Sequence, residues 1–262
     1  MVSPVDAAVE RALDVLLQRP SALISDIDGT LSRIVARPVD ATVSEPVRAS
    51  LRRLLPRLDL LGVVTGRESE VARRMVGVEG MTYVGSYALQ PGSLGPEAQR
   101  DVDTVKLAVL PYVGRLPCVH LEQKDVSFAL HFRNCDDPAG TRSRLISLVE
   151  PLVAGSGTKI VEGKQVIEVV PRALPDKGSA FATLLAQHAI RGAIFIGDDL
   201  GDTAAFREVR RRRLEEGRPG LAIAVVDAET PDAVLEYADL ALAGVDAVEA
   251  FLEALAMRLE SG

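Results

Sequence analysis

Four short polar segments hold most of the residues that could perform chemistry. They are Asp26–Thr30 (DIDGT), Thr65–Arg67 (TGR), Lys177, and Gly197–Asp202 (GDDLGD). Together they contain five aspartates, and carboxylates gathered in one half-buried place repel one another unless a cation lies among them. Oxygen donors without a nearby thiol or imidazole are the ligands that Mg²⁺ prefers. The segments therefore predict a magnesium site, with the alternative that single aspartates only cap helices or form turns.

Apolar runs next to these segments predict the strands that position them. The runs cover residues 21–27, 60–65, 82–85, 193–197, 221–226 and 240–243. They alternate with stretches of helical spacing at 1–19, 44–58, 68–75, 177–187, 202–213 and 245–259. This alternation is typical of an α/β fold with a doubly wound, Rossmann-like parallel sheet. Ligands of such sheets bind beyond the carboxyl ends of the strands, so we expect the four segments to meet at one edge.

The middle of the chain has a different pattern. From Val119 to Arg133 and from Thr158 to Val170, apolar and polar residues alternate, and each stretch contains a turn signal. A helical stretch, Asp137–Val153, lies between them. Two hairpins that flank a helix predict an antiparallel sheet covered on one face. We therefore expect an α+β cap domain at residues 106–172, inserted into a core domain made of residues 1–105 and 173–262.

Composition limits the class of protein. The 262 residues are 47% hydrophobic and 26% charged, as in an ordinary globular protein. The net charge of −7 disfavours non-specific binding to nucleic acid or to an anionic membrane, and no apolar run approaches the roughly 20 residues of a membrane span. We expect a cytoplasmic protein, monomeric by default, in which Cys118 and Cys135 are thiols in a reducing compartment.

In their order and context, DIDGT, TGR, a lysine at a helix start and GDDLGD resemble the four signature motifs of the haloacid dehalogenase superfamily. The resemblance implies that Asp26 is a nucleophile that forms an aspartyl-phosphate. It also implies that Asp28 protonates the leaving oxygen and then deprotonates the hydrolytic water. A dehalogenase would not need this second carboxyl group, because halide leaves unprotonated. Asp28 therefore favours phosphatase chemistry.

The same resemblance assigns roles to the residues around the nucleophile. Thr65 and Lys177 would hold the phosphoryl oxygens, and Lys177 would also offset the charge of Asp26. The implied ligands of Mg²⁺ are Asp26, the backbone carbonyl of Asp28, and Asp198, with Asp199 or Asp202 completing or orienting the coordination shell.

The predicted cap contains a series of charged patterns. They are E-x-K at 122–124, H-aromatic-R at 131–133, G-K at 163–164 and E-x-x-P at 168–171. This series, the opening DIDGTLSRIVARP and the segment GDDLGDTAAF resemble trehalose-6-phosphate phosphatases. The implied substrate-binding residues are Glu122, Lys124 and Glu168 for the distal glucose, Arg133 and Lys164 near the phosphate or its sugar, and in addition Arg67 and His131. The alternatives are a structural hydrogen-bonding role for His131 and a merely solvated face for the series.

One segment departs from this resemblance. Trehalose-6-phosphate phosphatases carry an Asn-His-Gly-x-Glu stretch after the third core strand, where this chain has Gly85–Gln90 (GSYALQ). The resemblance implies hydrolysis of trehalose 6-phosphate to trehalose and phosphate. The departure keeps other glycosyl phosphates open, namely mannosyl- or glucosyl-3-phosphoglycerate and sucrose phosphate. A sugar-phosphate sensor without catalysis is the alternative from another class, and a phosphoacceptor signalling domain would leave Asp28 and the cap unexplained.

Overall fold

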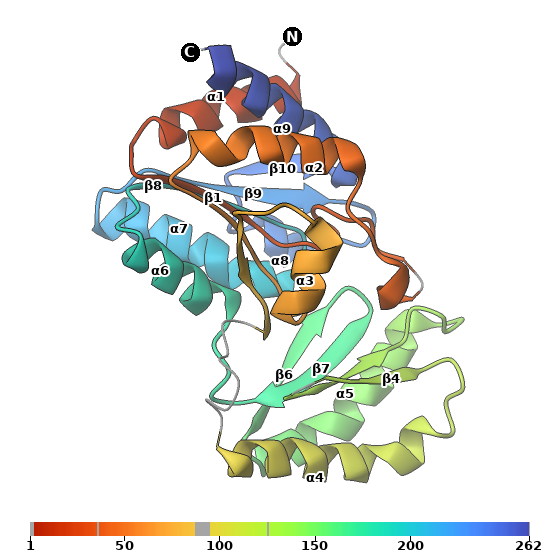
Figure 1. Cartoon of the computed structure of the whole chain (residues 1–262). Coiled ribbons are helices and arrows are strands. Elements are labelled where there is room, and N and C mark those ends of the chain that lie inside the picture. Colours follow the sequence, from red (N-terminus) through yellow and green to blue (C-terminus); the bar gives the residue numbers. More distant parts are fainter. Residues whose placement is uncertain (1–2, 36, 87–94, 125, 262) are drawn as a thin grey trace. The chain divides into compact units, whose positions relative to one another are not determined.

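The computed structural model describes residues 3–35, 37–86, 95–124 and 126–261 (Figure 1). The chain folds into two compact units, one made of Met1–Ala88 and Pro175–Gly262 and the other of Leu89–Leu174. The second unit begins before residue 106, the predicted start of the cap, because helix α4 (Pro96–Val113) packs on the sheet of this unit. A helical pattern alone does not tell which of two sheets the helix covers.

The first unit is built on a six-stranded sheet with the order β10-β9-β8-β1-β2-β3. Every pair of neighbouring strands is parallel. The strands are β1 (Ser21–Ser25), β2 (Leu60–Val64), β3 (Thr82–Val84), β8 (Gly192–Gly197), β9 (Gly220–Val226) and β10 (Leu240–Ala243). The predicted doubly wound α/β fold is confirmed. Strand order reverses between β1 and β8, and such a switch point is where sheets of this kind bind their ligands.

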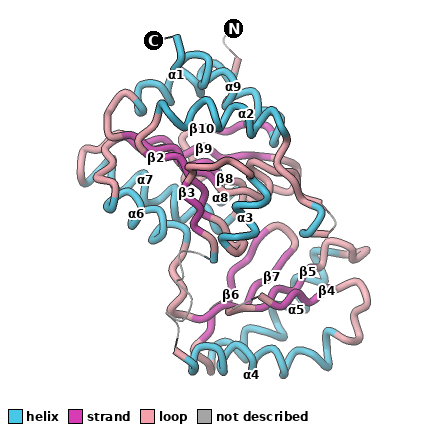
Figure 2. Tube along the Cα trace, in the orientation of Figure 1, coloured by secondary structure: helices cyan, strands magenta, loops and turns pink. Residues whose placement is uncertain are grey.

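Helices cover both faces of this sheet (Figures 1 and 2). One face carries α1 (Pro4–Leu16), α2 (Glu45–Leu54), α3 (Ser69–Val76) and α9 (Gly244–Ser261), and the other carries α6 (Lys177–Gln187), α7 (Thr203–Glu215) and the short α8 (Asp232–Leu235). Along β1, Leu23 packs into the first layer while Ala22 and Ile24 pack into the second. Burial of both faces explains why the strands are continuous apolar runs. Within the described residues, no helix is long and apolar enough to cross a membrane.

The second unit is a four-stranded antiparallel sheet with helices on one face, as predicted for the cap. The strand order is β4-β5-β7-β6. The elements are α4, β4 (His120–Gln123), β5 (Phe128–His131), α5 (Pro138–Ala154), β6 (Thr158–Gly163) and β7 (Val166–Pro171). Phe128, Leu130, Ile167 and Val169 pack in one core cluster with side chains of α4 and α5.

Residues at the alternate positions of these strands lie on the opposite face of the second sheet. Glu122 of β4 pairs with Ala129 of β5, which pairs with Glu168 of β7, so the two glutamates flank one alanine across three strands. We call this side the polar face. Its polar residues include Glu122, Lys124, Ser127, His131 and Glu168, together with His120, which pairs with His131, and Lys159 of β6.

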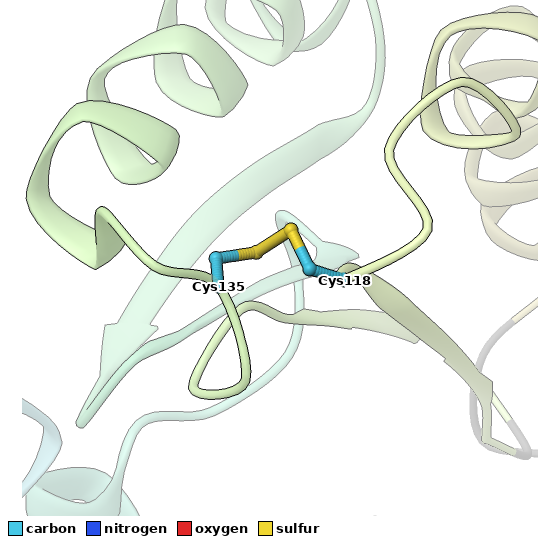
Figure 3. The surroundings of a disulfide bond; sticks show 2 residues. All are labelled: Cys118 and Cys135. Atoms are coloured by element: carbon cyan, nitrogen blue, oxygen red, sulfur yellow. A yellow bond between two sulfur atoms is a disulfide. The ribbon is translucent and has the colours of Figure 1, made fainter.

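Cys118 and Cys135 form a disulfide, with their Cα atoms 4.9 Å apart (Figure 3). The prediction of two free thiols is therefore wrong. Cys118 lies just before β4 and Cys135 lies in the turn after β5. Because β4 and β5 are antiparallel neighbours, the two ends of the hairpin meet. The sequence did not show this pairing, since a separation of 17 residues fits many arrangements of the chain.

Candidate active site

Three buried aspartates meet at the carboxyl ends of β1 and β8. Asp26 directly follows β1, where its backbone N–H donates to the carbonyl of Ile196 at 2.8 Å and continues the strand pairing. Asp198 directly follows β8, and Asp202 lies at the end of the short turn Leu200–Asp202. One carboxylate oxygen from each aspartate lies within 4.8 Å of the others. This is the edge at which the sequence predicted that the polar segments meet.

Lys177 lies among these carboxylates. It is the first residue of α6, and only 4% of it is exposed. Its Nζ lies 2.8 Å from Oδ2 of Asp26 and 2.7 Å from Oδ1 of Asp202, with Oδ1 of Asp199 at 3.9 Å. One ammonium group therefore faces three carboxylates. The remaining negative charge calls for a further cation.

Asp202 shapes the loop that carries Asp198. Its Oδ2 accepts hydrogen bonds from the backbone N–H groups of Asp198 at 2.9 Å and Asp199 at 3.1 Å. The Asp199 side chain in turn accepts from the backbone N–H of Gly201 at 2.9 Å. Asp202 is fully buried. Through these hydrogen bonds and its contact with Lys177, its carboxylate holds both the loop and the lysine in place.

Burial makes these carboxylates costly in the ionised form. It raises the pKa of Asp26 to about 6, against the opposing charge of Lys177. It also raises the pKa of Asp199 to about 6 and raises that of Asp202. A buried carboxyl group takes up a proton more readily because the low-dielectric surroundings disfavour its charge. A bound divalent cation would relieve the same cost.

The local backbone also fits a metal site. Gly29 follows Asp28 with φ +78°, and a Cβ at Gly29 would lie 2.0 Å from Oδ2 of Asp198. The loop after β1 thus passes directly against the Asp198 carboxylate, which only glycine allows. The donors are all oxygens, as a hard divalent cation requires. Among the residues that the structure describes, no other group of three or more acidic, histidine or cysteine side chains could hold a metal ion.

Arg67 is paired with Asp28. The guanidinium donates from Nε to Oδ2 at 2.6 Å and from Nη2 to Oδ1 at 2.7 Å, a two-point contact that fixes the plane of the carboxylate. Nη2 also donates to the carbonyl of Pro38 at 3.0 Å. The sequence predicted Arg67 as a substrate contact and gave no sign of this pairing.

The end of β3 holds the turn that carries Thr65 and Arg67. Thr65 is buried and donates its backbone N–H to the carbonyl of Val84 at 2.9 Å, and Ser86 donates to the carbonyl of Arg67 at 2.8 Å. A Cβ at Gly85 would lie 2.4 Å from that same carbonyl oxygen, so the two segments touch. Gly85 and Ser86 open the segment that departs from the family pattern, and its remaining residues, 87–90, lie outside the described residues.

The polar face brings four predicted sugar contacts into two pairs. Lys124 Nζ donates to Oε2 of Glu168 at 2.8 Å, and His131 Nε2 lies 2.7 Å from Oε2 of Glu122. Sequence reasoning missed Ser127, whose hydroxyl donates to Oε1 of Glu168 at 2.6 Å. No local signal marks this contact in the sequence, because Ser127 lies just before β5 and the pairing of β5 with β7 brings it to Glu168.

Arg133 and Lys164, the other two predicted contacts in the second unit, lie next to each other. Arg133 Nη2 donates to the backbone carbonyl of Lys164 at 3.1 Å. Lys164 belongs to the turn between β6 and β7. The Arg133 side chain thus reaches the backbone of this turn.

Known proteins resemble this chain over most of its length. A trehalose-phosphate phosphatase of Mycobacterium avium is 29% identical over 276 residues, covering 97% of this chain and 67% of that protein. An uncharacterized glycosyl hydrolase of Mycobacterium tuberculosis is 28% identical over 214 residues, covering 75% of this chain and 16% of that protein. The chain thus spans two thirds of the length of the Mycobacterium avium protein and about a sixth of the length of the Mycobacterium tuberculosis protein.

Solved structures show the same fold. The C-terminal domain of Candida albicans trehalose-6-phosphate phosphatase matches with a TM-score of 0.79 at 19% identity, covering 97% of this chain and 96% of that one. The family model described as trehalose-phosphatase matches residues 24–243, a range that runs from β1 to β10 and includes the whole second unit. This chain belongs to the trehalose-phosphatase family.

Proposed function

We propose that this protein is a Mg²⁺-dependent phosphatase that hydrolyses trehalose 6-phosphate to trehalose and phosphate. The observation that carries the proposal is the contact between Lys177 and Asp26, within a cluster of buried carboxylates at the end of β1. The family, and the relatives that are named trehalose-phosphate phosphatases, support the choice of substrate.

Asp26 would be the nucleophile. Lys177 holds its Oδ2 at 2.8 Å and so fixes the rotation of the carboxylate, and Oδ1 would attack phosphorus. A bond then forms between Oδ1 and phosphorus while the bond from phosphorus to the sugar oxygen breaks. Thr65 and Lys177 would hold phosphoryl oxygens, because fixed donors stabilise the charge of the transition state.

Asp28 would handle the protons of both steps. It would give a proton to the leaving sugar oxygen and then take one from the water that attacks the aspartyl-phosphate. The water oxygen bonds to phosphorus as the bond to Asp26 breaks, which releases phosphate and restores the carboxylate. We infer that Arg67 is a positioning residue for Asp28, since it holds both carboxylate oxygens.

Arg67→Lys should lower kcat by up to about 100-fold with little change in KM, because lysine keeps the charge but cannot hold two oxygens at once. Steady-state rates of phosphate release measure the effect. The matched control is Arg53→Lys, which breaks another two-point pair, with Glu260 on the surface of the first unit. Equal rates in wild type and Arg67→Lys would remove the positioning role.

Asp26, Asp198 and the backbone carbonyl of Asp28 would hold Mg²⁺, with Asp199 orienting the shell. When bound, Mg²⁺ neutralises charge on the phosphoryl group and the nucleophile. Asp202 would act through its hydrogen bonds to Lys177 and to the loop.

Mg²⁺ should raise the thermal unfolding midpoint more at about pH 8 than at about pH 5. Burial raises the pKa of Asp26 to about 6, so at the lower pH protons occupy a carboxylate that the cation needs. A ligand that binds only the folded chain stabilises it. Thermal scans with MgCl₂ or EDTA measure the shift. Asp198→Asn should abolish the Mg²⁺-induced shift. The control Asp246→Asn, at an exposed position, should leave the shift unchanged. A shift that persists in Asp198→Asn contradicts the proposed metal site.

The polar face would bind the sugar through hydrogen bonds to its hydroxyl groups. A sugar hydroxyl can donate a hydrogen bond to a carboxylate and accept one from an ammonium group beside it, and Glu168 with Lys124 is such a pair. Glu122, His131, Arg133 and Lys164 are the further candidates. The unmatched segment Gly85–Gln90 leaves the other glycosyl phosphates as competing substrates.

A substrate panel tests the proposed function. Phosphate release would be compared for trehalose 6-phosphate, sucrose 6-phosphate, mannosyl- and glucosyl-3-phosphoglycerate, and an aryl phosphate, each with MgCl₂. We expect trehalose 6-phosphate to have the highest kcat/KM. Faster hydrolysis of another glycosyl phosphate would replace the substrate, and binding without phosphate release from any of them would favour the sensor.

We also propose a monomer that acts in the cytoplasm, with a small-molecule sugar phosphate as its partner and without binding to nucleic acid or membrane. The proposal on location rests on the substrate, since a charged sugar phosphate does not cross a membrane unaided. The disulfide Cys118–Cys135 weighs against it, because reducing compartments keep most cysteines as thiols. Alkylation of thiols in intact cells, followed by mass spectrometry of the peptides, would decide between the two.

A further inference from the structure

Glu168 is a carboxylate of the polar face that two side chains hold, one at each oxygen. Ser127 Oγ donates to its Oε1 at 2.6 Å and Lys124 Nζ donates to its Oε2 at 2.8 Å. Glu168 is 8% exposed and Ser127 only 3%. We propose that Ser127 determines specificity by positioning Glu168 to accept a hydrogen bond from a hydroxyl of the sugar. The inference rests on the proposed function and extends it to a residue outside the charged series.

The two donors have different effects on the glutamate. Lys124 brings a charge on a long, flexible stem, so by itself it tolerates several orientations of the carboxylate. Ser127 has a single short rotor, and its hydrogen bond on the other oxygen fixes the plane. Each carboxylate oxygen has two lone pairs, so both bonds together still leave acceptor capacity on Glu168. The part of the ligand that this arrangement recognises is a neutral sugar ring that donates from a hydroxyl group.

The backbone keeps Ser127 in place. Its carbonyl accepts from the backbone N–H of Lys124 at 3.0 Å and from Nε2 of Gln123 at 3.1 Å, which closes the turn between β4 and β5. The next residue, Phe128, is fully buried and pairs with Val169 of β7. Ser127 is therefore anchored on both sides, and its hydroxyl can serve as a rigid support for Glu168.

Ser127 also leaves the charge of the pair unchanged. A second lysine at this position would fix Glu168 as well, but it would compete with the ligand hydroxyl for the carboxylate. A neutral hydroxyl orients the oxygen without neutralising it. This reasoning predicts that the hydroxyl, and not merely the small size of serine, is required.

The test compares Ser127→Ala and Ser127→Thr with wild type on trehalose 6-phosphate and on an aryl phosphate. The measured quantity is the ratio of kcat/KM for the two substrates, which cancels changes common to both. We expect Ser127→Ala to lower this ratio by about tenfold, mainly through KM for trehalose 6-phosphate, as for a lost hydrogen bond to a charged group. Ser127→Thr, which retains the hydroxyl, should restore most of it.

Ser143→Ala is the matched control, because the Ser143 hydroxyl donates only within α5, to the carbonyl of Ala139; its ratio should equal that of wild type. An equal loss on both substrates in Ser127→Ala, or a failure of threonine to restore the ratio, would overturn the role of Ser127. Wild-type protein that releases no phosphate from trehalose 6-phosphate would overturn the proposed function and this inference with it. Turnover with an unchanged ratio in Ser127→Ala would overturn the inference alone.

Discussion

Asp26→Asn is expected to lower kcat for phosphate release by at least roughly 10⁴-fold, in the range that the loss of a nucleophile costs other hydrolases. The amide has the shape of the carboxylate, but its oxygen is too weak a nucleophile to attack phosphorus. The reduced rate should apply equally to trehalose 6-phosphate and to an aryl phosphate, since both would pass through the same ester with Asp26.

The same substitution should not unfold the protein. Lys177 keeps its 2.7 Å contact with Asp202, and the change removes a carboxylate whose pKa burial raises to about 6. We therefore expect an unfolding free energy at about pH 8 that equals or exceeds that of wild type. Asp246→Asn controls for the chemistry of the substitution at an exposed position. Turnover by Asp26→Asn above a few per cent of wild type, after deamidation has been excluded by mass spectrometry, would contradict the covalent mechanism.

Lys177→Met should have the largest effect on stability. It removes the ammonium group that faces Asp26, Asp199 and Asp202, and breaking a buried ion pair from one side costs about 3–5 kcal/mol. Turnover should be lost as well. Denaturant titration in EDTA measures the unfolding free energy, and Lys106→Met, at a lysine that pairs with Asp103 along α4, is the matched control.

The loss in Lys177→Met should depend on pH. Burial raises the pKa of Asp26 and Asp199 to about 6 even though Lys177 opposes it; without the lysine, the pKa of each should rise further. A carboxyl group whose pKa is higher in the folded than in the unfolded chain destabilises the fold as pH rises through the folded value. The difference from wild type should be large at about pH 8 and small at about pH 5. Equal losses at both pH values would mean that packing, not charge, is responsible.

The strand-end site was predictable because the carboxyl ends of parallel strands share an edge. Asp26 and Asp198 follow neighbouring strands, so apolar runs with polar ends were enough to bring them together. The orientation of the Asp202 side chain could not be predicted from the strand pattern alone. Whether it or Asp199 faced the centre depended on the hydrogen bonds of a tight turn, in which one carboxylate accepts from two backbone N–H groups. Local sequence does not specify such a turn.

The partners of long side chains were not predictable. Arg67 follows β2 at the same edge as the other groups, and its reach allows a contact with either a ligand or Asp28. The outcome depends on the Pro38 carbonyl, which lies 29 positions away in the sequence and holds the same guanidinium. The contact of Ser127 was not predicted either, although its side chain is short. A serine in a turn looks ordinary, and only the pairing of β5 with β7 brings it to Glu168.

The disulfide that joins the two ends of the β4–β5 hairpin makes this part of the protein sensitive to reductant in the buffer. Cross-linking a loop of about 15 residues stabilises a fold by roughly 3 kcal/mol, and Cys118 and Cys135 enclose a loop of similar size. Dithiothreitol in a storage buffer would loosen the segment that carries Glu122, Lys124 and Ser127, without touching the phosphoryl-transfer groups. Protein stored with reductant and protein stored without it should then show the same activity toward an aryl phosphate. Their KM values for a disaccharide phosphate should differ.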